Sequence, residues 1–249
     1  MSGQRILVTG STRGIGRGIA ERFLQDGETV ILHGRTTQAV DRALSDLHPD
    51  FPHAEGLAAD LSDRSAIRRL AEVCGAIDVL INNAGLYIEG PADRLTATDW
   101  NRLMAVNLSA AWLLSRAFLD GLRERRGVIV NIASDAAFIG VAAGSAYCAS
   151  KGALVGLTRA LAIELMPEVR VMCVCPGPVE TDMMRDQVKA ATDPIAAQAQ
   201  WLDYAPLKRV ARPDEIAALV ACAASRDTGF ATGAAWLIDG GLTAGKRPG

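Results

Sequence analysis

Short apolar runs rich in β-branched residues alternate with longer helix-patterned stretches along the chain. Most of these runs are continuously apolar rather than alternating between apolar and polar residues. That pattern is typical of strands covered on both faces, so it predicts a parallel sheet flanked by helices. The expected strands are Arg5–Thr9, Thr29–His33, Glu55–Ala59, Ile77–Asn82, Gly127–Ala133, Arg170–Cys175 and Ala234–Ile238.

Local signals mark where the intervening helices begin. A strand and a helix together occupy about 25 residues, the size of one strand–helix unit. No linker or low-complexity tract interrupts the series, so residues 1–249 are predicted to form a single domain. The start signals are Asp63 or Ser65 before a helix over 66–74, a capping box of Thr96 and Asp99, and Pro213 in a first turn.

Composition and charge narrow the class of protein. The chain has 26 Lys and Arg against 28 Asp and Glu, a net charge of −2, which argues against a nucleic-acid binder. No apolar stretch reaches the length of about 18 residues that a membrane span needs. The cysteine count is odd, and Cys173 and Cys175 lie in an apolar run, which predicts buried thiols. With no signal peptide apparent after Met1, we expect a reducing, cytoplasmic location.

A glycine-rich loop directly follows the first expected strand. Glycines at this point allow a positive φ and a close approach of the backbone to a ligand. The helix that follows offers free N–H groups and a partial positive charge to a phosphate. The spacing differs from the commonest dinucleotide fingerprint, but the position predicts dinucleotide binding. The candidate residues are Gly10, Ser11, Thr12, Arg13, Gly14, Ile15 and Gly16.

The end of the second strand bears on the choice of dinucleotide. An acidic residue there would bind the adenine ribose diol of NAD, but this sequence has Gly34 followed by Arg35. Arg35 and Arg13 could instead pair with a 2′-phosphate. The sequence therefore favours NADP(H), with NAD left open.

Tyr147 and Lys151 lie one turn apart at the start of a strongly helical run, 146–165. That spacing places both side chains on one helix face. A phenol ionises near pH 10, and a nearby ammonium group favours the phenolate. We therefore expect Lys151, helped by a positive nicotinamide ring, to lower the pKa of Tyr147 towards neutrality.

Further polar residues are expected at the carboxyl edge of the same sheet, where open α/β sheets place ligands. Ser134 follows the fifth strand, and its hydroxyl can donate to a substrate carbonyl. Asn107 lies inside a helical stretch, 100–119, where asparagine is locally unfavourable and so predicts a specific polar role. The neighbouring strand ends supply Asn82-Asn83-Ala84-Gly85, Pro176-Gly177 and Thr181.

This ordered set of motifs resembles the short-chain dehydrogenase/reductase family over nearly the whole chain, from Ile6 to about Gly241. The resemblance implies a doubly wound Rossmann-type α/β domain with a mostly parallel sheet of about seven strands. It also implies a nicotinamide cofactor and hydride transfer between that cofactor and a ketone or secondary alcohol. The motifs are Thr9-Gly10-x3-Gly14-x-Gly16, Asp60, Asn82-Asn-Ala-Gly85, Asn107, Ser134, Tyr147-x3-Lys151, Pro176-Gly177 and Thr181.

The resemblance also implies roles for individual residues. Tyr147 would exchange the proton with the substrate oxygen, Lys151 would bind the nicotinamide ribose, and Ser134 would hold the substrate oxygen. Asn107 would order a water molecule on the proton path. The remaining cofactor contacts would come from Asp60 and Leu61 at the adenine, Asn83, Ala84 and Gly85 at the adenosine ribose, and Pro176, Gly177, Val179 and Thr181 at the nicotinamide. No metal is expected, and His33, His48 and His53 are predicted to be surface residues.

The substrate is less well defined by the sequence. Residues 180–207 resemble the family's mobile substrate loop, and their large side chains could either cover an apolar pocket or merely pack on the body. The pocket candidates are Met183, Met184, Trp201, Tyr204, Phe138, Ile139, Val141, Leu86 and Tyr87.

The resemblance extends both to 3-oxoacyl-thioester reductases and to sugar-acid and polyol dehydrogenases. Docking of an acidic acyl carrier protein would need a basic surface, to which Glu124-Arg-Arg126 could contribute, whereas Met166-Pro-Glu168 argues against it. A cofactor-binding regulator without turnover is the alternative of another class. The family also implies a homotetramer built on helices at 100–120 and 147–165 and on the C-terminal helix and strand.

Overall fold

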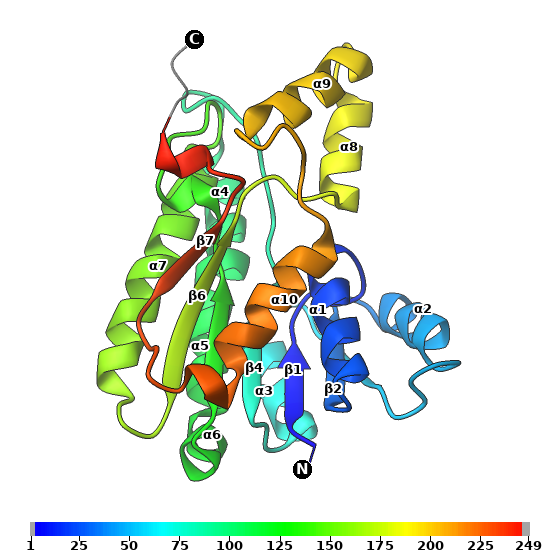
Figure 1. The fold of residues 1–249 in the computed structure, drawn as a ribbon, viewed down its shortest axis with the longest axis vertical. Helices are drawn as coiled ribbons and strands as arrows, with labels where there is room; N and C mark the ends of the chain where they lie inside the picture. Colours follow the sequence, from blue (N-terminus) through cyan, green and yellow to red (C-terminus); the bar gives the residue numbers. More distant parts are fainter. Residues whose placement is uncertain (1–2, 246–249) are drawn as a thin grey trace.

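The structure is a computed structural model that describes residues 3–245. Its centre is a seven-stranded parallel sheet in the order β3-β2-β1-β4-β5-β6-β7 (Figure 1). The strands are β1 (Arg5–Val8), β2 (Thr29–Gly34), β3 (Glu55–Ala58), β4 (Val79–Asn82), β5 (Val128–Ile132), β6 (Arg170–Pro176) and β7 (Ala235–Ile238). Each expected strand is confirmed to within two residues at either end, and so is the doubly wound fold class.

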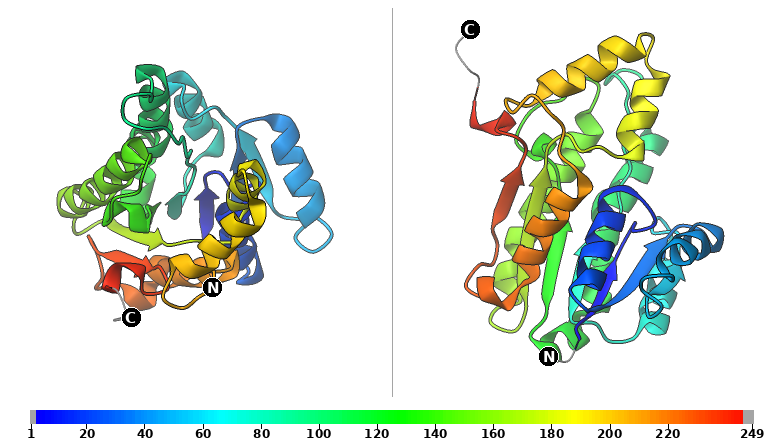
Figure 2. Two further views of the ribbon diagram at one scale, coloured as in Figure 1. Left: turned by 90° about the horizontal axis from the view of Figure 1, so that it is seen from above. Right: turned by 45° about the vertical axis from the view of Figure 1, so that its right-hand side comes forward.

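Helices cover both faces of the sheet (Figure 2). The five inner strands, from β2 to β6 in the sheet order, are almost wholly buried, which explains their largely apolar sequence, whereas the edge strands β3 and β7 are partly exposed. One apolar core packs α1 (Gly14–Gln25), α2 (Thr37–Leu47) and α10 (Pro213–Ala224) against the sheet. The other packs α3 (Arg64–Cys74), α5 (Ala110–Ala117), α6 (Leu119–Arg125) and α7 (Ser145–Glu164).

The expected helix-start signals are found in place. Asp63 accepts a hydrogen bond from the Ser65 N–H and caps α3, while Thr96 accepts one from the Asp99 N–H and caps α4 (Ala97–Met104). Pro213 begins α10. The predicted helix over 100–119 is interrupted, because a π-helical turn, η1 (Ala105–Ser109), separates α4 from α5.

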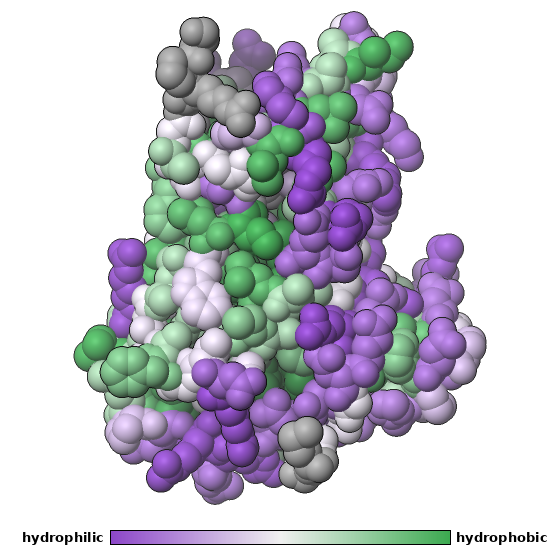
Figure 3. All heavy atoms as spheres, in the orientation of Figure 1, coloured by the Kyte–Doolittle hydropathy of each residue, from purple (hydrophilic) through white to green (hydrophobic). Residues whose placement is uncertain are grey.

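Two helices, α8 (Asp182–Ala190) and α9 (Pro194–Tyr204), stand above the carboxyl edge of the sheet (Figures 1 and 2). Neither helix contains a buried residue. In the space-filling view, apolar residues gather over the β7 side of the visible face, whereas polar residues cover the α1 side (Figure 3).

The described residues contain no helix long and apolar enough to cross a membrane. Cys173 and Cys175 are fully buried in β6, which confirms the predicted buried thiols. The expected domain count stays a prediction.

Candidate active site

The strand order reverses between β1 and β4, so the loops after these two strands face a shared crevice. Hydrogen bonds tie the two loops together. The Thr9 hydroxyl accepts from the backbone N–H groups of Asn83 (2.9 Å) and Ala84 (3.0 Å). The Asn83 amide donates back to the carbonyls of Thr9 (2.9 Å) and Gly10 (3.1 Å). These bonds hold the glycine-rich loop against the end of β4.

Gly10 makes this close approach possible. Its φ is +64°, a conformation that L-residues with a side chain rarely adopt. A Cβ atom added at Gly10 would lie 2.9 Å from the Ala84 Cα. Backbone conformation and contact distance therefore both require glycine at this position.

The start of α1 has free hydrogen-bond donors. Within residues 3–245, no side chain caps its first turn, whereas Thr36, Asp63 and Thr96 cap α2, α3 and α4. Uncapped N–H groups behind a glycine-rich loop, with the positive end of the helix dipole, form a binding site for an anion such as a phosphate. The geometry of this loop thus fits a dinucleotide.

The end of β2 lies beside the same loop. A Cβ atom at Gly34 would meet the Thr12 Cγ2 at 2.7 Å, so a larger residue would be strained here. Arg35 and Arg13 are exposed, and neither forms an ion pair with another described residue. Asp60 is exposed and lies near Arg35, and hydrogen bonds from Ser62 lower the pKa of its carboxyl. Leu61, next to it, is buried.

His33 corrects the sequence prediction, which placed it on the surface. It is 3% exposed, its Nδ1 accepts a hydrogen bond from the Gly10 N–H (3.1 Å), and its Nε2 lies 3.1 Å from the Ala59 carbonyl. This arrangement requires a neutral ring with the proton on Nε2. Burial lowers the pKa of His33 to about 4, which keeps the ring neutral. His48 and His53 are exposed, as predicted.

Tyr147 and Lys151 occupy one face of α7, as their spacing predicted. The Lys151 ammonium nitrogen lies 5.6 Å from the centre of the Tyr147 ring. Lys151 is 4% exposed and donates a hydrogen bond of 2.8 Å to the Ile132 carbonyl at the end of β5. Burial lowers the pKa of Lys151 to about 8, so the group remains mainly charged at pH 7.

In the protein chain alone, the pKa of Tyr147 lies above its usual value. Burial raises it to about 12, and the hydroxyl of Ser134 opposes this rise without overcoming it. The charge of Asp135 raises it further. The protein chain alone therefore keeps the phenol protonated, because the cost of burying a phenolate exceeds the benefit from its neighbours.

Asn107 explains the π-helical turn between α4 and α5. Its side chain is buried, accepts from the Leu86 N–H (2.7 Å) and donates to the Leu86 carbonyl (2.9 Å) and the Ser150 hydroxyl (3.1 Å). Ser150 donates in turn to the Tyr147 carbonyl (2.8 Å). Such turns are frequent at functional sites, and this one aims Asn107 at the start of α7. Sequence reasoning missed Ser150, although it lies between Tyr147 and Lys151.

Ser134 is nearly buried after β5, where its hydroxyl faces two partners. It donates to the Asp135 Oδ1 (2.7 Å) and accepts from the Ala136 N–H (3.2 Å) at the start of the short helix η2 (Asp135–Ala137). Asp135 is 6% exposed. Burial raises the pKa of its carboxyl, which the bonds from Ser134 and Ala136 oppose. Sequence reasoning did not identify Asp135.

The segment after β6 closes the other side of the crevice. A Cβ atom at Gly177 would lie 2.7 Å from the Asp239 Cα, so the chain passes close to the end of β7. Val179 is buried. Thr181 caps α8 by accepting from the Met184 N–H (3.3 Å), and a Cβ atom at Gly14 would lie 3.5 Å from the Thr181 Cγ2. The start of α8 therefore lies against the glycine-rich loop.

Of the expected pocket residues, Tyr87 packs directly against Tyr147. The Tyr87 ring meets the Tyr147 ring edge-on, with ring centres 5.0 Å apart. Trp201 and Tyr204 of α9 pack with ring centres 5.9 Å apart, and burial together with the charge of Asp135 raises the pKa of Tyr204. Met183 and Phe138 remain exposed.

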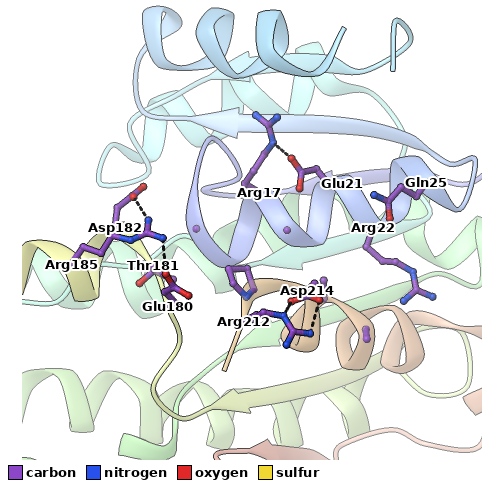
Figure 4. Close-up of a pocket in the computed structure, with 15 residues that line it drawn as sticks. Arg17, Glu21, Arg22, Gln25, Glu180, Thr181, Asp182, Arg185, Arg212 and Asp214 are labelled. Carbon is purple, nitrogen blue, oxygen red and sulfur yellow. Dashed lines mark hydrogen bonds and ion pairs between the residues drawn. The ribbon is translucent and has the colours of Figure 1, made fainter. Parts of the chain in front are cut away.

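A separate groove of about 740 Å³ lies between α1 and α10 (Figure 4). Its charged residues mostly neutralise one another, as in the pairs Arg17–Glu21 (2.6 Å) and Arg212–Asp214 (2.9 Å). The groove touches the site at Gly14 and Thr181 but contains none of the catalytic candidates. Residues 3–245 hold no cluster of His, Cys, Asp and Glu suited to a metal ion.

Comparison with known proteins identifies the family. The family described as short chain dehydrogenase matches residues 4–192. The chain is 37% identical to 2-(S)-hydroxypropyl-CoM dehydrogenase 3 of Xanthobacter autotrophicus, covering 96% of each chain. It is 34% identical to 3-oxoacyl-[acyl-carrier-protein] reductase of Vibrio harveyi, covering 97% of this chain and 98% of the relative.

A similar solved structure is ligand-free aldohexose dehydrogenase of Thermoplasma acidophilum. It has a TM-score of 0.88 and 30% identity, and the match covers 99% of this chain and 96% of that one. The chain thus belongs to the short-chain dehydrogenase/reductase family. It is an oxidoreductase of the kind that acts on alcohols and ketones with a nicotinamide cofactor.

Proposed function

We propose that this protein is an NADP(H)-dependent oxidoreductase that interconverts a ketone and a secondary alcohol, with Tyr147 as acid and base. One observation carries the proposal. Tyr147, Lys151, Ser134 and Asn107 come from three separate parts of the chain and converge at the carboxyl edge of the sheet. This edge lies beside a glycine-rich loop with free N–H groups.

The residues that would hold the cofactor fit a dinucleotide. Residues 10–16 would bind its pyrophosphate, the loops of residues 60–61 and 83–85 would flank the adenosine, and residues 176–181 would flank the nicotinamide. When bound, the nicotinamide donates or accepts the hydride. The protein chain contributes the placement of the substrate and the movement of the proton.

The preference for NADP(H) rests on the end of β2. Gly34 provides no carboxylate for a ribose diol, and Arg13 and Arg35 are exposed cations that form no ion pair with another described residue. Arg35→Ala should weaken NADPH binding by at least 10-fold and leave NADH binding nearly unchanged, because it removes a charge-assisted hydrogen bond. Arg42→Ala, an exposed arginine on α2, is the matched control. Equal weakening of both cofactors by Arg35→Ala would show that Arg35 does not bind the 2′-phosphate.

The four side chains divide the work at the reacting oxygen. Ser134 places the substrate oxygen, and the Tyr147 hydroxyl gives it a proton during reduction or receives one during oxidation. Lys151 supplies a nearby positive charge, which favours the phenolate at the moment the proton leaves. Asn107 fixes the distance between the Leu86 loop and α7, and so the position of Tyr147.

A 3-oxoacyl thioester is one candidate substrate, since such a reductase is among the similar proteins. The predicted basic contribution of Glu124–Arg126 does not support docking of a carrier protein at this site. These residues directly precede β5 at the end of α6, so they lie at the amino edge of the sheet (Figure 1), whereas Ser134 directly follows β5 at its carboxyl edge. Polyols and sugar acids, with NAD as cofactor, form the alternative substrate class.

The decisive experiment follows the absorbance of NADPH and NADH with a panel of diketones, 3-oxo esters, 2-hydroxy ketones and sugars. We expect oxidation of NADPH with at least one ketone. Binding of NADPH without turnover of any member of the panel would favour the regulator without catalysis. Turnover that is faster with NADH than with NADPH would contradict the cofactor assignment.

A further inference from the structure

Asp135 differs from Asp239, the other buried carboxylate of the described residues, in having an oxygen without a hydrogen-bond partner. Its Oδ1 accepts from the Ser134 hydroxyl (2.7 Å) and from the Ala136 N–H (2.7 Å). Its Oδ2 makes no hydrogen bond to any described residue. Across residues 3–245, the fully enclosed side-chain atom without a partner is Asn82 Oδ1, so Asp135 Oδ2 is not fully enclosed. The charge of Asp135 acts on the phenols of both Tyr147 and Tyr204, which places this carboxylate close to the two side chains.

Asp239, at the end of β7, provides the internal comparison. It is about as buried as Asp135, but both of its oxygens are occupied. Its Oδ1 accepts from the Gly241 N–H (2.9 Å), and its Oδ2 accepts from the Thr243 N–H (2.8 Å) and hydroxyl (2.5 Å). That is the pattern of a structural carboxylate. Asp135 lacks it, and Ser134 already caps the short helix to which Asp135 belongs.

The hydroxyl of Ser134 has one proton, which it cannot give to two acceptors at once. In the structure it gives this proton to Asp135. When Ser134 turns the proton to a substrate oxygen, Asp135 loses a partner in a nearly buried position, which costs free energy. A substrate that brings its own second hydroxyl replaces the lost partner.

From this we propose that Asp135 selects substrates that carry a hydroxyl group on the carbon next to the reacting carbon, namely vicinal diols and the corresponding 2-hydroxy ketones. This inference rests on the proposed function and names the substrate class of the same site. The oxygens of a vicinal diol are separated by about one hydrogen-bond length, which matches the spacing of Ser134 Oγ and Asp135 Oδ1. The reacting oxygen meets Ser134 and Tyr147, and the second hydroxyl donates to Asp135.

A substrate ammonium group would also attract a carboxylate, but charge argues against it here. The buried ammonium of Lys151 is positive and lies beside Tyr147, so a second cation in the same crevice would be repelled. A neutral hydroxyl donates to Asp135 without this penalty.

The test compares butane-2,3-diol with butan-2-ol, and 3-hydroxybutan-2-one with butan-2-one, as matched substrates that differ by one hydroxyl. The wild-type protein should have a higher kcat/KM for the hydroxylated member of each pair. Asp135→Ala should reduce that preference by about 10-fold or more, the cost of losing a hydrogen bond to a charged group, and leave the simple substrates within a few-fold. Asp135→Asn, which keeps the shape and a neutral acceptor, should reduce it less.

Asp239→Asn is the control for a merely structural effect, since it should lower the melting temperature and leave the preference unchanged. The inference is overturned if the wild-type enzyme turns over the simple substrates as well as their hydroxylated partners. It is also overturned if Asp135→Ala lowers kcat/KM equally for both members of each pair. Either result leaves the proposed function intact. A preference for 1-aminopropan-2-ol over the diol also overturns it. A protein that binds no nicotinamide cofactor contradicts both proposals.

Discussion

The glycine-rich loop region and the α8–α9 segment face the same crevice but are built differently. The loop region is held by partly buried hydrogen bonds among Thr9, Gly10, His33 and Asn83. The α8–α9 segment has no buried residue, and Ile195 is 83% exposed. One wall of the crevice is therefore fixed, and the other is held by few contacts.

This difference matches the two tasks of the proposed reaction. A cofactor is the same in every turnover, so its site can be rigid and preorganised. A substrate must enter and leave, and a segment with few buried apolar contacts opens at low cost in free energy. Substitutions in the glycine-rich loop region should therefore affect stability and cofactor binding. Substitutions in the α8–α9 segment should affect KM for the substrate.

The largest effect is expected at the fixed wall. Gly10→Ala adds a side chain at positive φ and against the Ala84 backbone, so we expect a loss of about 4 kcal/mol in the free energy of unfolding and a loss of cofactor binding. Gly27→Ala, also at positive φ (+82°) but with no atom within 4 Å, is the control and should cost about 1 kcal/mol. Urea unfolding measures both, and equal losses would contradict the close-packing argument.

A pH titration of stability tests the buried histidine. The folded-state pKa of His33, about 4, lies below the usual 6.5, so the unfolded chain binds more protons between these values. The contribution of His33 to the free energy of unfolding is therefore fully present above pH 6.5. It falls by about 3 kcal/mol as the pH drops to 4. His33→Gln should be less stable at pH 7 but lose less on acidification. His48→Gln should keep the wild-type slope, and a wild-type slope in His33→Gln would refute this origin.

The smallest effect on stability is expected in the α8–α9 segment. Trp201→Ala in α9 should change the free energy of unfolding by less than about 1 kcal/mol, because α9 contributes no buried residue. It should raise KM for the ketone several-fold while cofactor affinity stays the same. A substantial loss of stability would show that α9 packs as part of the body rather than as a cover.

The sequence predicted the fold and much of the site because both rest on local patterns. Apolar runs, most of them continuous, marked the strands, and the spacing of Tyr147 and Lys151 placed them on one helix face. The errors involve long-range burial. The burial of His33 depends on Gly10 and Ala59, and neither is its neighbour in sequence. The hydrophobic pattern of the sequence around His33 therefore does not predict it.

The sequence also could not show how burial acts on Tyr147. Desolvation raises the pKa of the phenol in the protein chain alone and depends on everything packed around the ring, so the lowering expected from Lys151 together with a bound nicotinamide stays a prediction. Asp135 and Ser150 were missed because single polar residues gain meaning only when the fold shows which of their atoms have partners. The roles assigned to the cofactor-contacting residues stay predictions.

The central claim is that the Tyr147 hydroxyl moves the proton in a crevice that holds the nicotinamide cofactor. Tyr147→Phe removes that hydroxyl alone, so the most direct test measures NADPH binding and ketone reduction in this variant. We predict unchanged NADPH affinity within about 3-fold and a decrease in kcat of at least 100-fold, the usual contribution of general acid–base catalysis. A variant that reduces the ketone at near wild-type rate would contradict the account.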